Sequence, residues 1–416
     1  MTPLEAERYL LELELFGMRF GLDRMRKLMT ALGMPQRRFA SIHVVGSNGK
    51  SSTVRMIAAI LRRHGIRTGS YTSPHLRSFS ERVEIDGTSI TPTAFAAAVA
   101  RAARAAELVS RTLEPGDAVT QFEAVTAAAY HELARERVEV AVVEAGLGGR
   151  FDATNVIPSR VQVLTGVGLE HTRWLGPTLA GIAEEKLAVV PDHGCLVTGQ
   201  LAPEVESVAE GAARARCARL VRVPDTTASA GESYALRPLG AFQRRNFALA
   251  RTAAEAFVGE LDEQAVRLAA REIEVPGRLE VVDERPLTLY DGAHNPAGAR
   301  ALGESLPEVL EGRALTGVFA VLDDKDAAGM LEALLPLCDR AVYTRTSNPR
   351  SLPPPTLESI AAKLGGPPSE RVGAPLAAVG RARALAGPQG AVLATGSIYL
   401  IADLVRAPGA ARASTL

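Results

Sequence analysis

The sequence has no excess of charge of either sign, few cysteines and no long apolar run. Lys+Arg and Asp+Glu both number 47 in 416 residues, so no bulk field attracts nucleic acid or an anionic membrane. The three cysteines, Cys195, Cys217 and Cys338, are too scattered for a metal site or a disulfide framework. No run approaches the roughly 20 apolar residues of a membrane span, and Met1–Glu5 is unlike a signal peptide. We therefore expect a cytoplasmic monomer that binds neither nucleic acid nor membrane.

The length and the apolar pattern predict an α/β protein of two domains. Short apolar runs alternate with helical patterns, which is typical of a mainly parallel sheet. The alternation restarts after Pro276, so we expect domains of residues 1–276 and 277–416, the second smaller and Rossmann-like. The expected strands are 41–45, 68–72, 138–144, 161–166, 195–198, 220–223, 287–290, 317–321, 341–344 and 391–394. Helical patterns cover residues 5–34, 121–135 and 179–189, whereas 224–239 is expected to be a surface excursion and the tail from Ala407 to be frayed.

A glycine-rich segment lies between the first predicted strand and a helix that runs to about His64. Backbone N–H groups of such a loop, together with a helix N-terminus, bind phosphate oxygens, and Lys50 would reach the β- and γ-phosphates. Val44 stands where the first glycine of the common pattern falls, and a plain strand-to-helix turn is the alternative. The order of strand, Gly-Lys-Ser and helix favours a P-loop-type domain that binds phosphate groups. The predicted phosphate-binding residues are Ser47, Asn48, Gly49, Lys50, Ser51 and Ser52.

Several runs of the sequence are distinctive. The most specific are Tyr71–Leu76 (Tyr-Thr-Ser-Pro-His-Leu) and Glu144–Asn155 (Glu-Ala-Gly-Leu-Gly-Gly-Arg-Phe-Asp-Ala-Thr-Asn), and others lie at residues 47–52, 168–172, 185–186, 276–278 and 291–296. Together, and in this order, these runs resemble the folylpolyglutamate synthase/dihydrofolate synthase family of the Mur ligase superfamily, and the resemblance covers nearly the whole chain. Ser51, Ser80 and Ala188 depart from the residues usual in the family. The resemblance implies an ATP-dependent ligase that adds L-glutamate to folates and to dihydropteroate.

The resemblance also implies metal ligands. It places Ser73, Glu144 and His171 around one Mg²⁺, and a carboxylate at the carboxyl edge of a parallel sheet suits such a hard cation. From the residues alone, Glu144 could instead pair with Arg150 at the surface, and Ser73 could be a turn residue before Pro74. Imidazole is an unusual ligand for Mg²⁺, so Glu144 is the firmer prediction.

Lys186 follows two glutamates on a predicted helix. The residues alone are compatible with a solvated, charged helix face. The resemblance implies that this lysine reacts with carbon dioxide to give a carbamate, which requires a depressed lysine pKa. A carbamylated Lys186 would hold a second Mg²⁺.

Residues late in the chain are predicted to bind the nucleotide and to take part in catalysis. The resemblance places Asn246 on adenine, Arg278 on phosphates and Asp291 near the ribose, although Asn246 could also be a helix cap. It places His294 and Ser397 beside the incoming glutamate and the transferred phosphate. His294 alone would be interpreted as a turn histidine with local partners.

The folate-binding residues implied by the resemblance are less distinctive. Phe122 could stack on a pterin or fill the core. The implied residues are Arg19, Phe20, Gly21, Phe122, Glu123, Asp152 and Ala153.

The expected reaction activates the folate carboxylate as an acyl phosphate, which the glutamate amine then attacks. Lys50 and Mg²⁺ would stabilise charge on the transferred phosphoryl group, and His294 or the departing phosphate would accept the amine proton. Two alternatives remain at this point. A muramyl-peptide ligase shares the loop and the lysine but would not need Ser73–Leu76, and a non-catalytic nucleotide-binding switch would not need the second domain.

Overall fold

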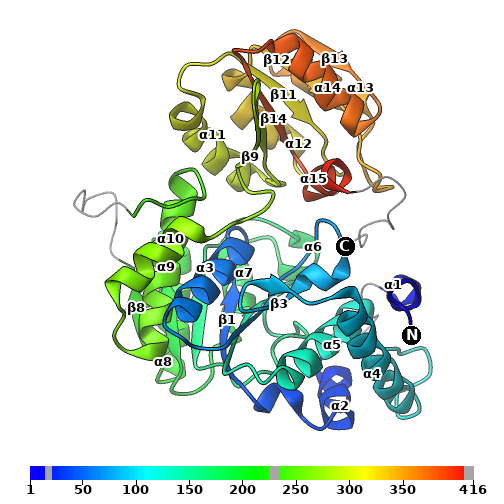
Figure 1. The fold of residues 1–416 in the computed structure, drawn as a ribbon, viewed down its shortest axis with the longest axis vertical. Coiled ribbons are helices and arrows are strands. Elements are labelled where there is room, and N and C mark those ends of the chain that lie inside the picture. Colours follow the sequence, from blue (N-terminus) through cyan, green and yellow to red (C-terminus); the bar gives the residue numbers. More distant parts are fainter. Residues whose placement is uncertain (15–20, 224–233, 407–416) are drawn as a thin grey trace. The chain divides into compact units, whose positions relative to one another are not determined.

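A computed structural model describes residues 1–14, 21–223 and 234–406 (Figure 1). These residues form two compact units, each with its own sheet. The first contains described residues up to Ala235 and Arg245–Ile273, and the second contains Leu236–Arg244 and described residues from Glu274. Helix α9 (Ala241–Val258) therefore begins in the second unit and continues in the first. In the part of the chain that is described, no helix is both long enough and apolar enough to cross a bilayer.

The first unit is built on an eight-stranded sheet in the order β4-β3-β2-β5-β1-β6-β7-β8. The strands from β2 to β8 in this order are parallel, whereas β3 and β4 add an antiparallel edge. Because parallel strands end at the same edge, the segments after β1, β2, β5 and β6 lie together. The strands are β1 (Ala40–Val45), β2 (Thr68–Tyr71), β3 (Val83–Ile85), β4 (Thr88–Ser89), β5 (Val140–Glu144), β6 (Val161–Leu164), β7 (Cys195–Thr198) and β8 (Arg219–Arg222).

Helices bury the apolar residues of this sheet. Buried side chains of α1, α2, α4 and α5 form one core with β2, β3 and β5, and α7 and α8 form another with β1, β6 and β7. Helix α3 contacts β1, β2 and β5 and packs against α10. The helices are α1 (Pro3–Glu12), α2 (Asp23–Ala31), α3 (Lys50–Arg63), α4 (Pro92–Ser110), α5 (Gln121–Arg135), α6 (Thr172–Leu175), α7 (Leu179–Leu187), α8 (Pro203–Ala215) and α10 (Glu263–Glu272), with 3₁₀ turns η1 (Pro35–Arg37) and η2 (Phe79–Arg82).

The second unit has a six-stranded sheet in the order β13-β12-β11-β14-β10-β9. All neighbouring strands are parallel except β9, which pairs antiparallel with β10 at the edge. Its strands are β9 (Glu280–Glu284), β10 (Leu287–Tyr290), β11 (Leu315–Phe319), β12 (Arg340–Tyr343), β13 (Ser369–Arg371) and β14 (Ala391–Thr395). Its helices are α11 (Pro296–Leu310), α12 (Ala327–Leu334), α13 (Pro354–Lys363), α14 (Pro375–Ala386) and α15 (Ile398–Val405), with the 3₁₀ turn η3 (Leu335–Leu337).

The structure confirms the α/β class and every predicted strand to within about two residues. The helical pattern over 5–34 is instead divided between α1 and α2, with non-helical residues on either side of the undescribed 15–20. The structure also contains α4, the β3–β4 hairpin, β9 and β13, for which the sequence analysis gives no expectation. Most of the expected surface excursion (224–233) and the tail (407–416) lie outside the described residues.

Candidate active site

The segment after β1 has the geometry of a phosphate-binding loop. Gly49 adopts φ +84° at the N-cap of α3, a conformation that favours glycine, and Lys50 begins the helix. A Cβ at Gly46 would lie 2.0 Å from Thr165 Oγ1, so the close approach of the segment after β6 requires glycine there. The Thr165 hydroxyl donates to the carbonyl oxygen of Asn48 at 2.6 Å. The loop is therefore held over the N-terminus of α3, where anions bind favourably.

Two side chains of the loop, those of Lys50 and Ser47, hydrogen-bond to nearby backbone groups. Lys50 Nζ donates to the carbonyl oxygens of Gly46 at 2.9 Å and Ser47 at 3.2 Å. Ser47 is buried, and its hydroxyl exchanges hydrogen bonds with the backbone of Gly168. Ser52 is buried within the first turn of α3. The lysine thus lies across its own loop, within reach of the place where phosphates would sit.

Glu144 ends β5 beside this loop. It is 2% exposed and accepts hydrogen bonds from Ser51 Oγ at 3.0 Å and from the backbone N–H of Ser73 at 3.1 Å. The surface pairing with Arg150 is wrong, because Arg150 pairs with Glu185 at 3.0 Å. A buried carboxylate next to two serines offers the hard oxygen atoms that Mg²⁺ prefers, so these residues fit the ion.

The third predicted magnesium ligand lies in a different setting. His171 is exposed and adopts φ +47° at the start of the one-turn helix α6. In the ranges that the structure describes, no group of three His, Cys, Asp or Glu side chains is close enough to hold a metal. A magnesium ion at Glu144 would therefore need hydroxyl, phosphate or water oxygens to complete its coordination.

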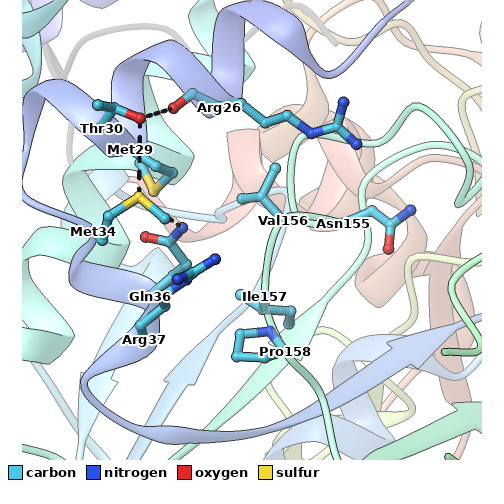
Figure 2. A pocket seen from close by; sticks show the side chains of 10 residues that line it. All are labelled: Arg26, Met29, Thr30, Met34, Gln36, Arg37, Asn155, Val156, Ile157 and Pro158. Carbon is cyan, nitrogen blue, oxygen red and sulfur yellow. Dashed lines mark hydrogen bonds between the residues drawn. The ribbon is translucent and has the colours of Figure 1, made fainter. Parts of the chain in front are cut away.

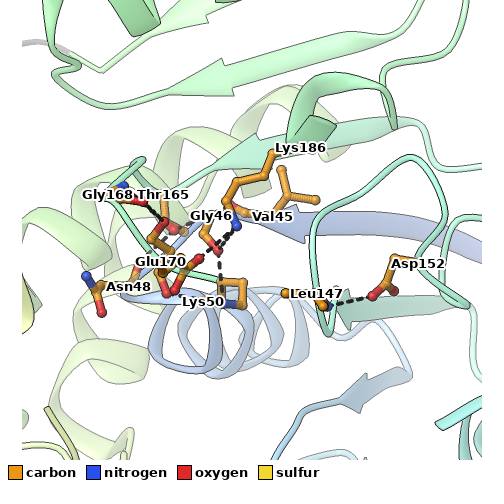
Figure 3. Close-up of polar contacts among 11 residues, drawn as sticks. Val45, Gly46, Asn48, Lys50, Leu147, Asp152, Thr165, Gly168, Glu170 and Lys186 are labelled. Atoms are coloured by element: carbon orange, nitrogen blue, oxygen red, sulfur yellow. Dashed lines mark hydrogen bonds and ion pairs between the residues drawn. The ribbon is translucent and has the colours of Figure 1, made fainter. Parts of the chain in front are cut away.

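Lys186 is buried rather than solvated, which contradicts the charged-face alternative. Its side chain is 2% exposed, and Nζ donates to Gly46 O and to Glu170 Oε1, both at 2.9 Å. Figure 3 shows Lys186 and Lys50 converging on the same carbonyl group of Gly46, with Glu170 alongside. Burial lowers the pKa of Lys186, with Glu170 acting in the opposite direction. Burial would raise the pKa of Glu170, but Lys186 and Lys50 outweigh it and lower that pKa to about 2.

The predicted folate-binding residues gather partly in one place. Phe122, at the start of α5, packs so closely on Gly146 that a Cβ there would lie 2.5 Å from its ring. Asp152 is buried in the loop after β5 and accepts a hydrogen bond from Leu147 N at 2.7 Å. Ala153 is buried in the adjoining core. Arg19 and Phe20 lie outside the described residues, whereas Gly21 precedes α2.

The carboxylate of Glu123 is engaged inside the protein. Arg24 Nε lies 3.0 and 3.1 Å from its two oxygens, and Thr120 N and Oγ1 donate to Oε2. Arg24 also pairs with Asp117 at 2.9 Å. Glu123 therefore joins α2 to the first turn of α5, which carries Phe122.

Asn246 is not a helix cap, because it lies five residues beyond the first residue of α9. A Cβ at Gly49 would be 2.6 Å from Asn246 Oδ1, so this side chain lies against the start of α3. Its place beside the phosphate-binding loop is compatible with a nucleotide contact.

In the second unit, Asp291 and Ser397 follow neighbouring strands. Asp291 N donates to Ala394 O, and the buried Asp291 carboxylate accepts from the backbone N–H groups of Leu279 at 2.8 Å and Ala293 at 2.7 Å. Burial raises the pKa of Asp291, whereas Arg278 acts to lower it. Ser397 is the N-cap of α15 and accepts from Tyr399 N at 3.2 Å.

His294 and Arg278 both lie against the turn after β10. His294 Nδ1 is 2.9 Å from the carbonyl oxygen of Gly292, as expected for a histidine with a local partner. Because a carbonyl oxygen only accepts, Nδ1 carries the hydrogen in the neutral ring and Nε2 is the basic nitrogen. A Cβ at Gly292 would lie 2.6 Å from Arg278 Nη1, so the guanidinium crosses this turn.

Comparison with known proteins identifies the family. Residues 277–398 match the family model "Mur ligase, glutamate ligase domain". The dihydrofolate synthase/folylpolyglutamate synthase of Mycobacterium tuberculosis is 38% identical over 381 residues, covering 83% of this chain and 78% of that protein. The chain belongs to the folylpolyglutamate synthase/dihydrofolate synthase family of Mur ligases. Its members are ATP-dependent ligases.

Solved structures of the family agree along the whole chain. The M. tuberculosis folylpolyglutamate synthase complexed with ADP has a TM-score of 0.90 and 34% identity, covering 97% of both chains. Escherichia coli FolC in complex with DHPP and ADP has a TM-score of 0.85 and 28% identity, again covering 97% of both chains.

A pocket of about 410 Å³ is lined by none of the predicted site residues, although Asn155, the last residue of the run Glu144–Asn155, borders it (Figure 2). It lies between the second half of α2, the turn η1 and residues 155–158. Because η1 precedes β1 and residues 155–158 precede β6, this pocket is at the amino edge of the sheet, opposite the phosphate-binding loop. It is therefore separate from the candidate active site.

Two important charged residues of this family member were not singled out from the sequence. Glu170 lies in the matched run 168–172, where the resemblance implies a role for its neighbour His171 alone. Arg24 lies in an ordinary amphipathic helix, and its sequence context does not indicate a buried ion pair. The pairings of Glu170 with Lys186 and of Arg24 with Glu123 cross 16 and 99 positions of the chain, so only the folded chain reveals them.

Proposed function

We propose that this chain joins L-glutamate to tetrahydrofolates and to dihydropteroate, using ATP and an acyl-phosphate intermediate. The observation that carries the proposal is the convergence of Lys50, Lys186 and Glu144 on the loop after β1, in a chain related along its length to enzymes of these names. We further propose that it acts as a cytoplasmic monomer.

The first unit would activate the carboxylate. Lys50 and the N-terminus of α3 would neutralise the γ-phosphoryl group as it moves from ATP to the folate carboxylate. Glu144 and the hydroxyl groups of Ser51 and Ser73 would hold Mg²⁺, with His171 as a further candidate ligand. When bound, Mg²⁺ supplies positive charge beside the phosphate oxygens. Asn246, which lies against Gly49, would contact the nucleotide.

Residues of the second unit are also proposed to bind substrates. Arg278 and Asp291, on the turn after β10, would contact the phosphates and the ribose of ATP. The amine nitrogen of the glutamate substrate would attack the acyl carbon as phosphate leaves, and the basic Nε2 of His294 would accept the proton that the amine loses. Ser397 already accepts a hydrogen bond from Tyr399 N, so its own hydrogen is directed elsewhere and can reach an anionic substrate group.

We also propose that Lys186 is carbamylated in the active enzyme and holds a second Mg²⁺. The neutral amine would attack carbon dioxide and release a proton, and burial favours the neutral form because it lowers the lysine pKa. The pair with Glu170 would have to separate, since the carbamate and the carboxylate are both anions.

The decisive assay measures ADP release and glutamate incorporation with each pterin substrate. Release that requires a pterin and glutamate together supports the ligase. Activity with a uridine-linked muramyl peptide would support the muramyl ligase, whereas nucleotide binding without turnover would support the switch.

A further inference from the structure

A buried histidine on β1 is linked to the predicted folate-binding loop. His43 is 0% exposed, and its Nε2 lies 2.8 Å from Thr154 Oγ1. The Thr154 hydroxyl in turn donates to Asp152 Oδ1, which also accepts from Thr154 N at 3.0 Å. His43 and Thr154 lie 111 positions apart in the chain, so their contact depends on the tertiary structure.

The hydrogen bonds that link His43, Thr154 and Asp152 have a defined direction. An ionised carboxylate can only accept, so the Thr154 hydrogen points to Asp152 and its oxygen accepts from His43. His43 must therefore carry its hydrogen on Nε2, and its Nδ1 has no hydrogen-bonding partner in the described structure. Burial lowers the pKa of His43 to about 3, which keeps the ring neutral at ordinary pH.

The chain of hydrogen bonds ends on the backbone beside Phe122. The other oxygen of Asp152 accepts from Leu147 N at 2.7 Å, and the backbone of Gly146 also bonds to this carboxylate. Gly146 is the residue on which the Phe122 ring packs. The loop after β5 is thus linked through Thr154 to His43 on β1, the strand that leads into the phosphate-binding loop.

We propose that His43 is a positioning residue for the folate substrate, acting through Thr154 on Asp152 and on the loop that Asp152 holds. This inference rests on the proposed folate ligase function. A purely structural role is the alternative, because neighbouring positions of β1 are apolar and a leucine could fill the same space. The two roles differ in whether binding of the pterin substrate depends on the hydrogen at Nε2 of His43.

Paired substitutions separate these roles. The amide nitrogen of glutamine can occupy the place of Nε2, whereas the shorter asparagine reaches only the place of Nδ1 and leaves Thr154 without its donor. We would compare His43→Gln, His43→Asn and His43→Leu, together with Thr154→Ser and Thr154→Val, in which only serine keeps the hydroxyl. For each, KM for dihydropteroate and for tetrahydrofolate, KM for ATP, kcat and the melting temperature are measured.

We expect His43→Asn, His43→Leu and Thr154→Val to raise KM for the pterin substrates about tenfold, the scale of one lost buried hydrogen bond. His43→Gln and Thr154→Ser should remain within about threefold of the parent. KM for ATP and kcat should change little, and the ratio of variant to parent should be constant between about pH 6 and 8 because His43 does not titrate there.

Three results would overturn the proposal. One is a pterin KM for His43→Leu or Thr154→Val equal to that of the parent. Another is a loss in His43→Gln as large as in His43→Asn. The third is a uniform loss of kcat and melting temperature without a change in KM, which would indicate a structural role. A parent enzyme without pterin-dependent turnover would instead refute the proposed function, so the two failures are distinguishable.

Discussion

Replacing Glu170 with glutamine tests the buried ion pair beside the phosphate-binding loop. The substitution preserves shape but leaves the Lys186 ammonium, 2% exposed, without its carboxylate partner. The pKa of Glu170 falls from its usual value of 4.5 to about 2 in the folded protein, which corresponds to roughly 3 kcal/mol of stability at neutral pH before the opposing cost of burying the Lys186 ammonium is subtracted. Breaking a buried pair by removing one partner generally costs about 3–5 kcal/mol.

The pH dependence of this difference has a definite sign. Because folding lowers the pKa of Glu170, its contribution is fully present above the unfolded value of 4.5 and is lost as the pH falls toward 2. Glutamine has no such contribution at any pH. The difference in unfolding free energy between parent and Glu170→Gln should therefore be largest near neutral pH and fall to less than half by about pH 3.

Urea unfolding followed by tryptophan fluorescence can measure this effect in the first unit. The chain has a single tryptophan, Trp174, four positions after Glu170 and in the same unit. Glu185→Gln is a matched control, because Glu185 pairs with Arg150, whose side chain is 51% exposed, and such a pair contributes about 0–1 kcal/mol. Carbon-dioxide-free buffer prevents carbamylation of Lys186, so that its ammonium group is present.

An equal and small loss in Glu170→Gln and Glu185→Gln would refute the reasoning. It would mean that the buried ammonium finds enough compensation from the Gly46 carbonyl alone. A difference in unfolding free energy between the parent and Glu170→Gln that grows as the pH falls would also contradict the proposed role of the ion pair.

Other predictions concern turnover. Lys50→Ala should lower kcat by about a hundredfold or more while leaving the melting temperature within a few degrees, because the hydrogen bonds that Lys50 makes in the described structure go to carbonyl oxygens of its own loop. ADP release near the parent rate would remove Lys50 from the site. Glu144→Gln should abolish the magnesium-dependent rate, since the amide lacks the charge that holds the ion, and a titration of rate against Mg²⁺ that matches the parent would exclude Glu144 as a ligand. If Lys186 works as a carbamate, Lys186→Glu should retain more activity than Lys186→Arg, and acetate should partly restore Lys186→Ala. Equal activity with arginine would instead show that a cation is needed at this position. In that case, intact-mass measurement of the protein would find no added mass of about 44 Da (carbon dioxide).

Local patterns predicted the elements around the site but not their partners. The run Gly46–Ser52 is sufficient to predict the glycine turn between β1 and α3, because its backbone geometry depends on nearby glycines; that this turn binds phosphate stays a prediction. The position of Glu144 at the end of an apolar strand placed it at the carboxyl edge of the sheet. The helical pattern over 5–34 was misleading as one stretch, because periodicity does not show where a helix stops when the stop is set by packing.

The sequence by itself determined the α/β class, the glycine turn between β1 and α3 and the carboxylate that ends β5, since each follows from the spacing of neighbouring residues. Only the tertiary structure decided that Lys186 is buried against Glu170 rather than solvated, that Arg24 engages Glu123, and that His43 supports Asp152 through Thr154. The physical reason is that burial and ion pairing depend on which distant segments meet when strands assemble into a sheet. A charged residue in a helix has the same local signature whether its neighbour in space is water or a carboxylate.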